Sequence, residues 1–405
     1  MDMKLLESLR GELEHFTRQF DDCIKTQPSR EHFQRYVAGQ LSDLPRKSVE
    51  PIALQARVPP RSLQEFLSIH RWDEGAVRDR LRELVAAHHA HAEAIGIIDE
   101  TSFPKKGTKT PGVQRQHCGA SGKTENCVVT VHLGYVAGDF HTLLDGDLYL
   151  PRETWHEDRG RCREAGIPDD LGFRPKWRIA LDLLETAVEG GLALKWLCAD
   201  EEYGARLSFR LGVAELGLFY VAEIPPHNAG WLSSRIGERT ARQVRHLWKR
   251  GGPSWERWRI KDTGNGPSVW DVRAVRFRVR EERVPGEEQW LVIASNVLED
   301  EVKYFLSNAP KDTPLRVLLH VAFSRWHIEQ LFRVAKQETG LDHFEGRRYR
   351  GLRRHLTLTS ASLLFLAEQR ARLKKKGSRS RSSSSKPPWN VSSMRNSRSP
   401  SVVAG

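Results

Sequence analysis

Two largely apolar runs that each end in an aspartate constrain the fold of this chain most. Residues 95–98 are followed by Asp99, and residues 194–199 are followed by Asp200. Short runs of this kind are typical of buried strands, and a helical pattern over residues 176–189 lies between them. Further strands are predicted at 127–136, 140–150 and 218–222. The sequence therefore predicts an α/β fold in which adjacent strand ends bring the two aspartates close together.

Changes in pattern divide the rest of the chain. Residues 1–90 are predicted to be helical, and a helix, short turn, helix order around Pro59 and Pro60 fits a DNA-binding helix-turn-helix or a small helical bundle. The tail is too rich in Ser and Arg to bury a core. We expect the remaining segments to be the first part of an α/β core (91–224), a β-rich insertion (225–313), the second part of the core with C-terminal helices (314–376) and a disordered tail (377–405).

The net charge of +12 is distributed unevenly along the chain. Nine Lys and Arg side chains, and no Asp or Glu, lie in residues 371–405, so that residues 1–370 carry a net charge of only +3. The total charge is therefore weak evidence for nucleic-acid binding, and local clusters have to carry that argument.

The cysteines and the apolar runs exclude several classes of protein. Five scattered cysteines without a CxxC pair predict neither a zinc site nor a disulfide framework. No apolar run approaches the roughly 18 residues that a membrane helix needs, and the N-terminus lacks the apolar core of a signal peptide. We therefore expect a cytoplasmic protein without a membrane partner.

Residues 324–336 are predicted to belong to a long helix that begins at Pro314. Apolar side chains on one side of this segment are typical of a helix that packs on a sheet. Alternating charges also occur on solvated helix surfaces, and both interpretations stay open here. At 3.6 residues per turn, positions i, i+4, i+8 and i+11 place four charged side chains on one face, namely Arg325, Glu329, Arg333 and Lys336.

Asp99, Asp200 and Glu329 form a candidate metal site. Three converging carboxylates repel one another unless cations neutralise them. Carboxylate oxygens suit Mg²⁺ or Mn²⁺, and two such ions about 3.5–4 Å apart promote phosphodiester chemistry. The three cations on the same helix face as Glu329 are candidates for holding substrate phosphates. A single strand-end aspartate is more often a turn or helix cap, so this hypothesis needs all three acids.

The spacing from Arg325 through Glu329 to Lys336 resembles part of a known signature. It matches the Arg-Glu-Lys part of the Tyr-Arg-Glu-Lys signature of bacterial insertion-sequence transposases of the DDE class. The position of a β-rich segment between Asp200 and Glu329 is similar to this family, and the resemblance covers about residues 45–370. Three strings also resemble the family, namely IIDET at 97–101, ADEEYG at 199–204 and GLDHF at 340–344.

The resemblance implies an RNase H-like mixed sheet flanked by helices, with a β-rich insertion and an N-terminal helical domain. It implies cut-and-paste DNA transposition by Asp99, Asp200 and Glu329 with two Mg²⁺ ions per site, for which Mn²⁺ substitutes. The implied partners are the element's terminal inverted repeats, target DNA and a second copy of the chain, as a homodimer in a synaptic complex at the bacterial nucleoid. The signature's tyrosine would fall at Ala322, so its phosphate contact is missing here or comes from another residue.

Further basic and aromatic side chains are candidate DNA contacts. Five arginines within eight positions follow the Glu329 segment, and we expect them to bind the phosphate backbone: Arg347, Arg348, Arg350, Arg353 and Arg354. Lys105 and Lys106 lie in a basic, glycine-containing loop. Glu201 and Glu202 are interpreted as first-turn helix acids rather than metal ligands. Six tryptophans enrich the β-rich segment; most are expected to be core, and one is a candidate for stacking on a flipped base: Trp231, Trp248, Trp255, Trp258, Trp270 and Trp290.

Two other functions remain compatible with the sequence. A metal-dependent nuclease on the same fold would hydrolyse nucleic acid without strand transfer, because a fold alone does not fix a function. An inactive DNA-binding relic would keep the fold and bind DNA without cutting it. Inverted repeats beside the gene distinguish a transposase from a nuclease, and metal-dependent cleavage separates both from the relic.

Overall fold

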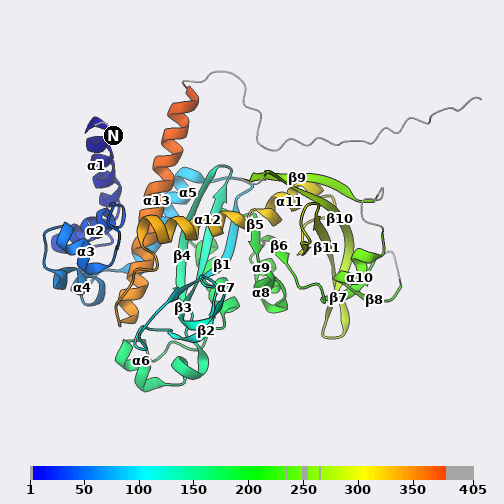
Figure 1. The fold of residues 1–405 in the computed structure, drawn as a ribbon, viewed down its shortest axis with the longest axis horizontal. Coiled ribbons are helices and arrows are strands. Elements are labelled where there is room, and N and C mark those ends of the chain that lie inside the picture. Colours follow the sequence, from blue (N-terminus) through cyan, green and yellow to red (C-terminus); the bar gives the residue numbers. More distant parts are fainter. Residues whose placement is uncertain (1–2, 234–235, 249–253, 264–265, 380–405) are drawn as a thin grey trace, which may run out of the picture.

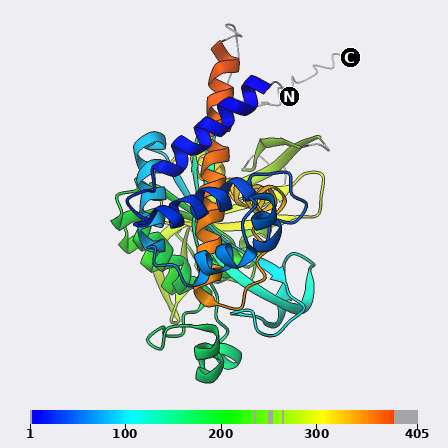
Figure 2. The same ribbon diagram turned by 90° about the vertical axis from the view of Figure 1, so that its left-hand side faces the viewer.

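The computed structural model describes residues 3–233, 236–248, 254–263 and 266–379 of the 405-residue chain (Figures 1 and 2). The tail that the sequence predicts to be disordered falls outside the described residues from position 380 onward. Among the described residues, no helix is both long enough and apolar enough to cross a membrane.

Helices fill the N-terminal part of the chain and pack beside the last helix, α13 (Tyr349–Arg379) (Figure 2). The carboxylate of Asp73 caps the last of them by accepting the backbone N–H groups of Gly75 and Ala76 at 2.9 and 3.1 Å. A buried hydrogen bond of 3.0 Å joins the hydroxyl of Tyr36 to the ring of His355 on α13. These helices are α1 (Met3–Arg18), α2 (Gln27–Gln40), α3 (Val49–Gln55), α4 (Pro60–Ser68) and α5 (Glu74–His89).

A mixed sheet organises the rest of the molecule. At its centre β1 pairs antiparallel with β3 and parallel with β5, β5 pairs parallel with β6, and β4 pairs antiparallel with β3. This order, with helices on both faces, confirms the predicted RNase H-like α/β class. The strands are β1 (Ile95–Pro104), β2 (Gln114–Cys118), β3 (Lys123–Ala137), β4 (Phe140–Leu148), β5 (Trp196–Ala199) and β6 (Phe219–Glu223).

The β-rich segment continues this sheet instead of standing beside it. Strand β12 pairs with β6 through Phe305 opposite Glu223 and Leu306 opposite Ala222, and β11, β10 and β7 follow outward (Figure 1). The described strands therefore form one sheet of 12 strands. The added elements are β7 (Ala229–Leu232), β8 (Glu238–Thr240), α10 (Ala241–His246), β9 (Glu256–Thr263), β10 (Gly266–Glu281), β11 (Val284–Asn296) and β12 (Val302–Ser307).

Side-chain alternation along β1 and β5 produces two packed layers. Ile97 and Cys198 pack on one face of the sheet, in the same apolar cluster as Ile328 of helix α12. Ile98 and Ala199 point to the other face and join a cluster that includes the apolar side chains of α7 and α9. The helices between the central strands are η1 (Arg152–His156), α6 (Arg159–Ala165), α7 (Lys176–Glu189), α8 (Glu201–Gly204) and α9 (Leu207–Glu215).

The predicted long helix from Pro314 through Glu329 is wrong in one respect, because it is interrupted. The structure has α11 (Leu315–Phe323), α12 (Trp326–Val334) and a wider turn, η2 (Ala335–Thr339). At the interruption the hydroxyl of Ser324 donates to the carbonyl of His320, and a ring nitrogen of His327 lies 2.9 Å from the carbonyl oxygen of Ser324. These side-chain hydrogen bonds compete with the backbone hydrogen bonds of a helix. Backbone bonds there join residues three apart, as from Ile328 N–H to the carbonyl of Arg325.

Candidate active site

Asp99 lies within β1 and Asp200 directly follows β5, at the point where the pairing of these two parallel strands ends. The predicted end of the first strand at Asp99 is wrong, because β1 continues to Pro104 through its pairing with β3. Ile98 of β1 is opposite Ala199 of β5, so the next residue on each strand is an aspartate. Side chains alternate along a strand, so Asp99 is on the same face as Ile97, and Asp200 is on the same face as Cys198. This is the face that α12 covers. The apolar runs thus bury the strands, and the first polar residue after each run points into the site.

Backbone N–H groups hold both aspartates through hydrogen bonds. Asp99 is buried, and its carboxylate accepts the N–H of Glu100 at 2.8 Å. Asp200 caps α8, because its carboxylate accepts the N–H groups of Glu202 at 3.0 Å and Tyr203 at 3.4 Å. Asp200 therefore has the capping role that the sequence offered as the simpler interpretation, and it also adjoins Asp99.

Arg325 connects Glu329 to Asp99 through two ion pairs. The guanidinium of Arg325 lies 2.9 Å from the Asp99 carboxylate and 3.1 Å from the Glu329 carboxylate. Asp99 is buried, whereas the Glu329 side chain is 55% exposed and stands at the solvent side of the pair. The break between α11 and α12 places Arg325 at the start of α12, where it faces Asp99 in the middle of β1.

The electrostatics of the site reflect several acids around one cation. Burial raises the pKa of Asp99 to about 7; Arg325 counteracts this rise, and the charges of Asp200 and Glu329 add to it. Burial also raises the pKa of Asp200, again against the effect of Arg325. Burial alone would lower the pKa of Arg325, but the carboxylates of Asp99, Glu329 and Asp200 raise it above its ordinary value. The three acids therefore interact, and Arg325 is their counter-charge in this state.

The donor atoms at the site fit a hard divalent cation. All three acids offer carboxylate oxygens, which Mg²⁺ and Mn²⁺ prefer. In the arrangement seen here, no group of three or more His, Cys, Asp or Glu side chains among the described residues is close enough together to hold a metal ion. Arg325 occupies the space between Asp99 and Glu329 instead.

The two other cations predicted on this helix face differ in their surroundings. Arg333 of α12 is exposed. Lys336, in the wider turn η2, is partly buried, and its ammonium lies 3.4 Å from the carbonyl oxygen of Ser102 on β1. Burial lowers the pKa of Lys336 below its ordinary value. The spacing of the signature therefore brings Lys336 close to the strand that carries Asp99.

The arginines after the site divide into two groups. Arg347, Arg348 and Arg350 are exposed, as a DNA-contacting role requires. Arg354 is buried and donates to the backbone carbonyls of Phe66, Leu67 and Trp72 at 2.8–3.2 Å, and Arg353 lies 3.0 Å from Glu74. Arg353 and Arg354 both join α13 to the N-terminal helices, so the exposed arginines are the better candidates for phosphate contacts.

Lys105 and Lys106 also differ from each other. The ammonium of Lys105 donates to the carbonyls of Asp342 and Phe344 at 3.2 and 2.5 Å, and burial lowers its pKa. Lys106 is exposed. Lys105 thus fastens the end of β1 to the segment after η2, and Lys106 is the more accessible of the two.

The position of the signature's tyrosine carries no hydroxyl. Ala322 is buried in the core beside α12, and its carbonyl oxygen lies 3.5 Å from the sulfur of Cys198. The ring of the neighbouring Phe323 packs against Trp270 and Phe305. At the position of the signature's tyrosine, this chain therefore has a residue that packs in the core.

Sequence reasoning missed a second charged cluster behind the aspartates. The ammonium of Lys176, the first residue of α7, lies 2.9 Å from the Glu100 carboxylate and 3.2 Å from that of Glu202. Burial raises the pKa of Glu100, and Lys176 opposes that rise. Glu202 is a first-turn acid of α8 as expected, but it also has this specific partner. The only signal in the sequence was a lysine at a helix N-terminus, which the helix dipole disfavours.

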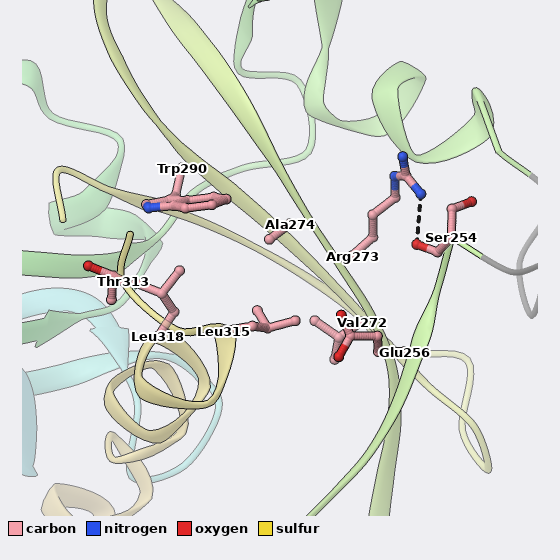
Figure 3. A pocket seen from close by; sticks show the side chains of 9 residues that line it. All are labelled: Ser254, Glu256, Val272, Arg273, Ala274, Trp290, Thr313, Leu315 and Leu318. Atoms are coloured by element: carbon pink, nitrogen blue, oxygen red, sulfur yellow. Dashed lines mark hydrogen bonds between the residues drawn. The ribbon is translucent and has the colours of Figure 1, made fainter. Parts of the chain in front are cut away.

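A cavity of about 370 Å³ lies between the β-rich segment and α11 (Figure 3). Trp290 and Ala274 border it from the strands, and Leu315 and Leu318 border it from the helix. The indole N–H of Trp290 donates to the carbonyl of Pro310 at 3.0 Å, and the guanidinium of Arg276 lies 4.8 Å from the indole ring centroid. Of the six tryptophans singled out in the sequence, Trp290 is the one that lines this cavity.

Comparison with known proteins places the chain in a family. Residues 19–284 match the family described as DDE superfamily endonuclease, and the chain belongs to that family. This range includes Asp99 and Asp200 and ends before Glu329. A protein of Microchaete diplosiphon named "Probable transposase for insertion sequence element IS701" is 28% identical over 324 residues, which cover 78% of this chain and 76% of that protein. The family predicted from the sequence is thereby confirmed. The chain is an enzyme of a superfamily that acts on DNA and generally depends on divalent metal ions.

Proposed function

We propose that this chain is a transposase that cuts DNA at the ends of its element and joins the freed 3′-hydroxyls to target DNA. Asp99, Asp200 and Glu329 are the catalytic and metal-binding acids in this proposal. The observation that carries it is the position of the two aspartates where the pairing of β1 with β5 ends, with Arg325 joining Asp99 to Glu329. The name of the Microchaete diplosiphon relative supports the choice of transposition over simple hydrolysis.

The residues of the site have distinct roles in this mechanism. Asp99 and Asp200 would hold Mg²⁺ from the sheet, and Glu329 would complete the site from α12; we propose two ions per site, with Mn²⁺ as a substitute. Such ions, when bound, would supply activation of the attacking oxygen and stabilisation of the leaving one. Arg325 withdraws from the carboxylates when a DNA phosphate offers it a bidentate partner. This exchange leaves the three carboxylates without a protein counter-charge, which favours their use as ligands.

Exposed cations around the site position the DNA. Arg333 and Lys106 are exposed, and Lys336 lies 3.4 Å from a backbone carbonyl of the strand that carries Asp99. The exposed arginines after η2 extend the basic surface, namely Arg347, Arg348 and Arg350. Lys105 contributes less directly, because its ammonium already binds two carbonyls. Contacts of this kind fix the register of DNA without reading its sequence.

Trp290 is our candidate for stacking on a base displaced at the cleaved end. It borders the cavity between the β-rich segment and α11, the helix that leads into α12. An indole face, a nearby arginine and an open volume are the features that a flipped base requires. The other tryptophans of the segment do not line this cavity.

The assembly follows from the reaction. Joining two element ends requires two active sites held together, so we propose a homodimer that forms on the terminal inverted repeats. We propose that it acts in the cytoplasm at the nucleoid.

A strand-transfer assay distinguishes the proposed transposase from a nuclease on the same fold. Precut element ends with a free 3′-hydroxyl are incubated with Mg²⁺, the protein and a supercoiled plasmid. Joined end–plasmid products are expected with the natural 3′-hydroxyl and absent with a 3′-dideoxy end. Efficient cleavage of uncut ends without any joined product would favour the nuclease instead.

A further inference from the structure

Lys176 lies on the opposite face of the sheet from the proposed catalytic acids. Asp99 points toward α12, and Glu100, one position later on the same strand, points toward α7. Lys176 therefore meets β1 from behind the site. It lies 2.9 Å from Glu100, and its own side chain is only 22% exposed.

The same ammonium also contacts the second segment that carries an aspartate. Glu202 is two residues after Asp200, in the first turn of α8, and lies 3.2 Å from Lys176. One side chain thus links the residue after Asp99 to the turn that Asp200 caps. Without the cation, two carboxylates would face each other at this place and push the segments apart.

The position of Lys176 indicates that its two ion pairs have a structural role. It is the first residue of α7, where the helix dipole favours acids and disfavours cations. A lysine at this end is stabilised mainly by its two carboxylate partners. A mere solubilising residue would not have to be partly buried between them.

We propose that Lys176 is a positioning residue that sets the distance between Asp99 and Asp200 from the far face of the sheet. It touches neither DNA nor the metal ions. It acts through β1, which contains Asp99, and through α8, which Asp200 caps, so that the two aspartates stay at the spacing at which two carboxylates share a cation. This inference rests on the proposed function of the two aspartates as metal ligands.

The affinity for Mn²⁺ alone tests this role, and titration calorimetry on the full chain without DNA measures it. The direction in which a substitution changes this affinity distinguishes a positioning role from a simple electrostatic one. By simple electrostatics, removing a cation near the site would strengthen binding of Mn²⁺. A positioning role predicts the opposite, a loss of about 10-fold in affinity for Lys176→Met, as is usual for residues that orient metal ligands. Lys176→Arg is expected to retain most of the affinity, since it keeps the bridging charge.

Lys195 offers a matched control on the same two strands. It precedes β5 and lies 2.5 Å from Glu93, which precedes β1, so this ion pair links the two strands at their opposite end. Lys195→Met removes the same charge and an ion pair between the same segments. It should leave the affinity for Mn²⁺ unchanged.

A second variant keeps the test decisive if Lys176→Met folds poorly. Lys176→Met with Glu202→Gln restores the net charge of the cluster and removes the repulsion, and should regain most of the affinity. Unchanged or tighter binding in Lys176→Met, or an equal loss in Lys195→Met, would overturn the proposal. So would a double variant that binds no better than Lys176→Met. Absence of Mn²⁺ binding in the wild type would instead contradict the metal site itself.

Discussion

Arg325 donates to Asp99 at 2.9 Å while its other terminal nitrogen lies 3.1 Å from Glu329. One guanidinium thus occupies two of the three carboxylates that the proposed reaction assigns to metal ions. Binding of metal and pairing with Arg325 compete for the same oxygens. A DNA phosphate that takes Arg325 would therefore favour metal binding, and by linkage metal would favour DNA.

Replacing this arginine should strengthen metal binding in the free protein. Arg325→Gln is expected to bind Mn²⁺ about 10-fold more tightly than wild type without DNA, because the competing cation is gone. The exposed Arg333 on the same helix is the control: Arg333→Gln removes an equal charge and should change the affinity little. Titration calorimetry with and without an element-end DNA measures both effects. Equal affinities in Arg325→Gln and wild type would refute the competition.

Acid should destabilise the fold through buried histidines. Nε2 of His355 lies 3.1 and 3.2 Å from the carbonyl oxygens of Gly340 and Leu341, so it donates, and Nδ1 accepts from Tyr36. Burial lowers the pKa of His355 from 6.5 to about 4. The unfolded chain therefore binds the proton first, and stability is lost as pH falls from about 6.5 toward 4.

The variant His355→Gln should have a shallower dependence of unfolding free energy on pH. Over this pH range, the unfolding free energy of wild type is expected to fall by up to about 3 kcal/mol more than that of the variant. Denaturant unfolding at several pH values between 8 and 4.5 measures it. His132 and His141 share the lowered pKa of about 4, so some slope should remain. Parallel curves for variant and wild type would exclude this role of His355.

Arg354 and Arg350, both on α13, should respond differently to substitution. Arg354→Ala removes the donor to three buried carbonyls and is expected to cost about 3 kcal/mol or more of stability. Arg350→Ala should change stability by no more than about 0.5 kcal/mol and weaken DNA binding, with a smaller salt dependence. Thermal melting beside DNA-binding titrations in several salt concentrations separates the two. A stable Arg354→Ala protein with weak DNA binding would restore the phosphate-binding interpretation of that residue.

Stacking on Trp290 should be visible at the DNA end. A fluorescent base analogue placed at the terminal nucleotide is expected to change its emission when bound to wild type and to change less with Trp290→Ala. The loss of stacking should weaken end binding by about 1–3 kcal/mol. Trp231→Ala, on β7 and away from the lining of the cavity, is the control and should behave as wild type. Identical signals from both variants would remove Trp290 as the stacking residue.

The sequence predicted those parts of the molecule in which local pattern and fold agree. The apolar runs before Asp99 and Asp200 gave both the strands and the neighbouring positions of the two acids. The i, i+4 spacing of Arg325 and Glu329 indicated their pairing, which the structure has at 3.1 Å. Lys336 lies in the following wider turn, η2, which the helical period did not predict.

Features that depend on contacts between distant segments were not predictable in this way. One local feature was missed as well, namely the interruption at Ser324, where side-chain hydrogen bonds to residues three and four positions away compete with the backbone hydrogen bonds of the helix. The arginines at 353 and 354 looked like a phosphate-binding cluster until their partners in the N-terminal helices were visible. Lys176 contacts Glu100 and Glu202, which lie 76 and 26 positions away in the sequence, and no local pattern indicates such contacts.

Cleavage of the DNA that flanks the gene tests the central claim most directly. Wild type and Asp200→Ala are incubated with this DNA in Mg²⁺, in Mn²⁺ and in chelator, and DNA binding is measured in parallel. The account predicts cuts at two flanking repeats by wild type with either metal. It predicts no cuts by Asp200→Ala or in chelator, while the variant still binds DNA. Cleavage by Asp200→Ala at the wild-type rate would contradict the assigned site, and binding without cutting by wild type would identify an inactive relic.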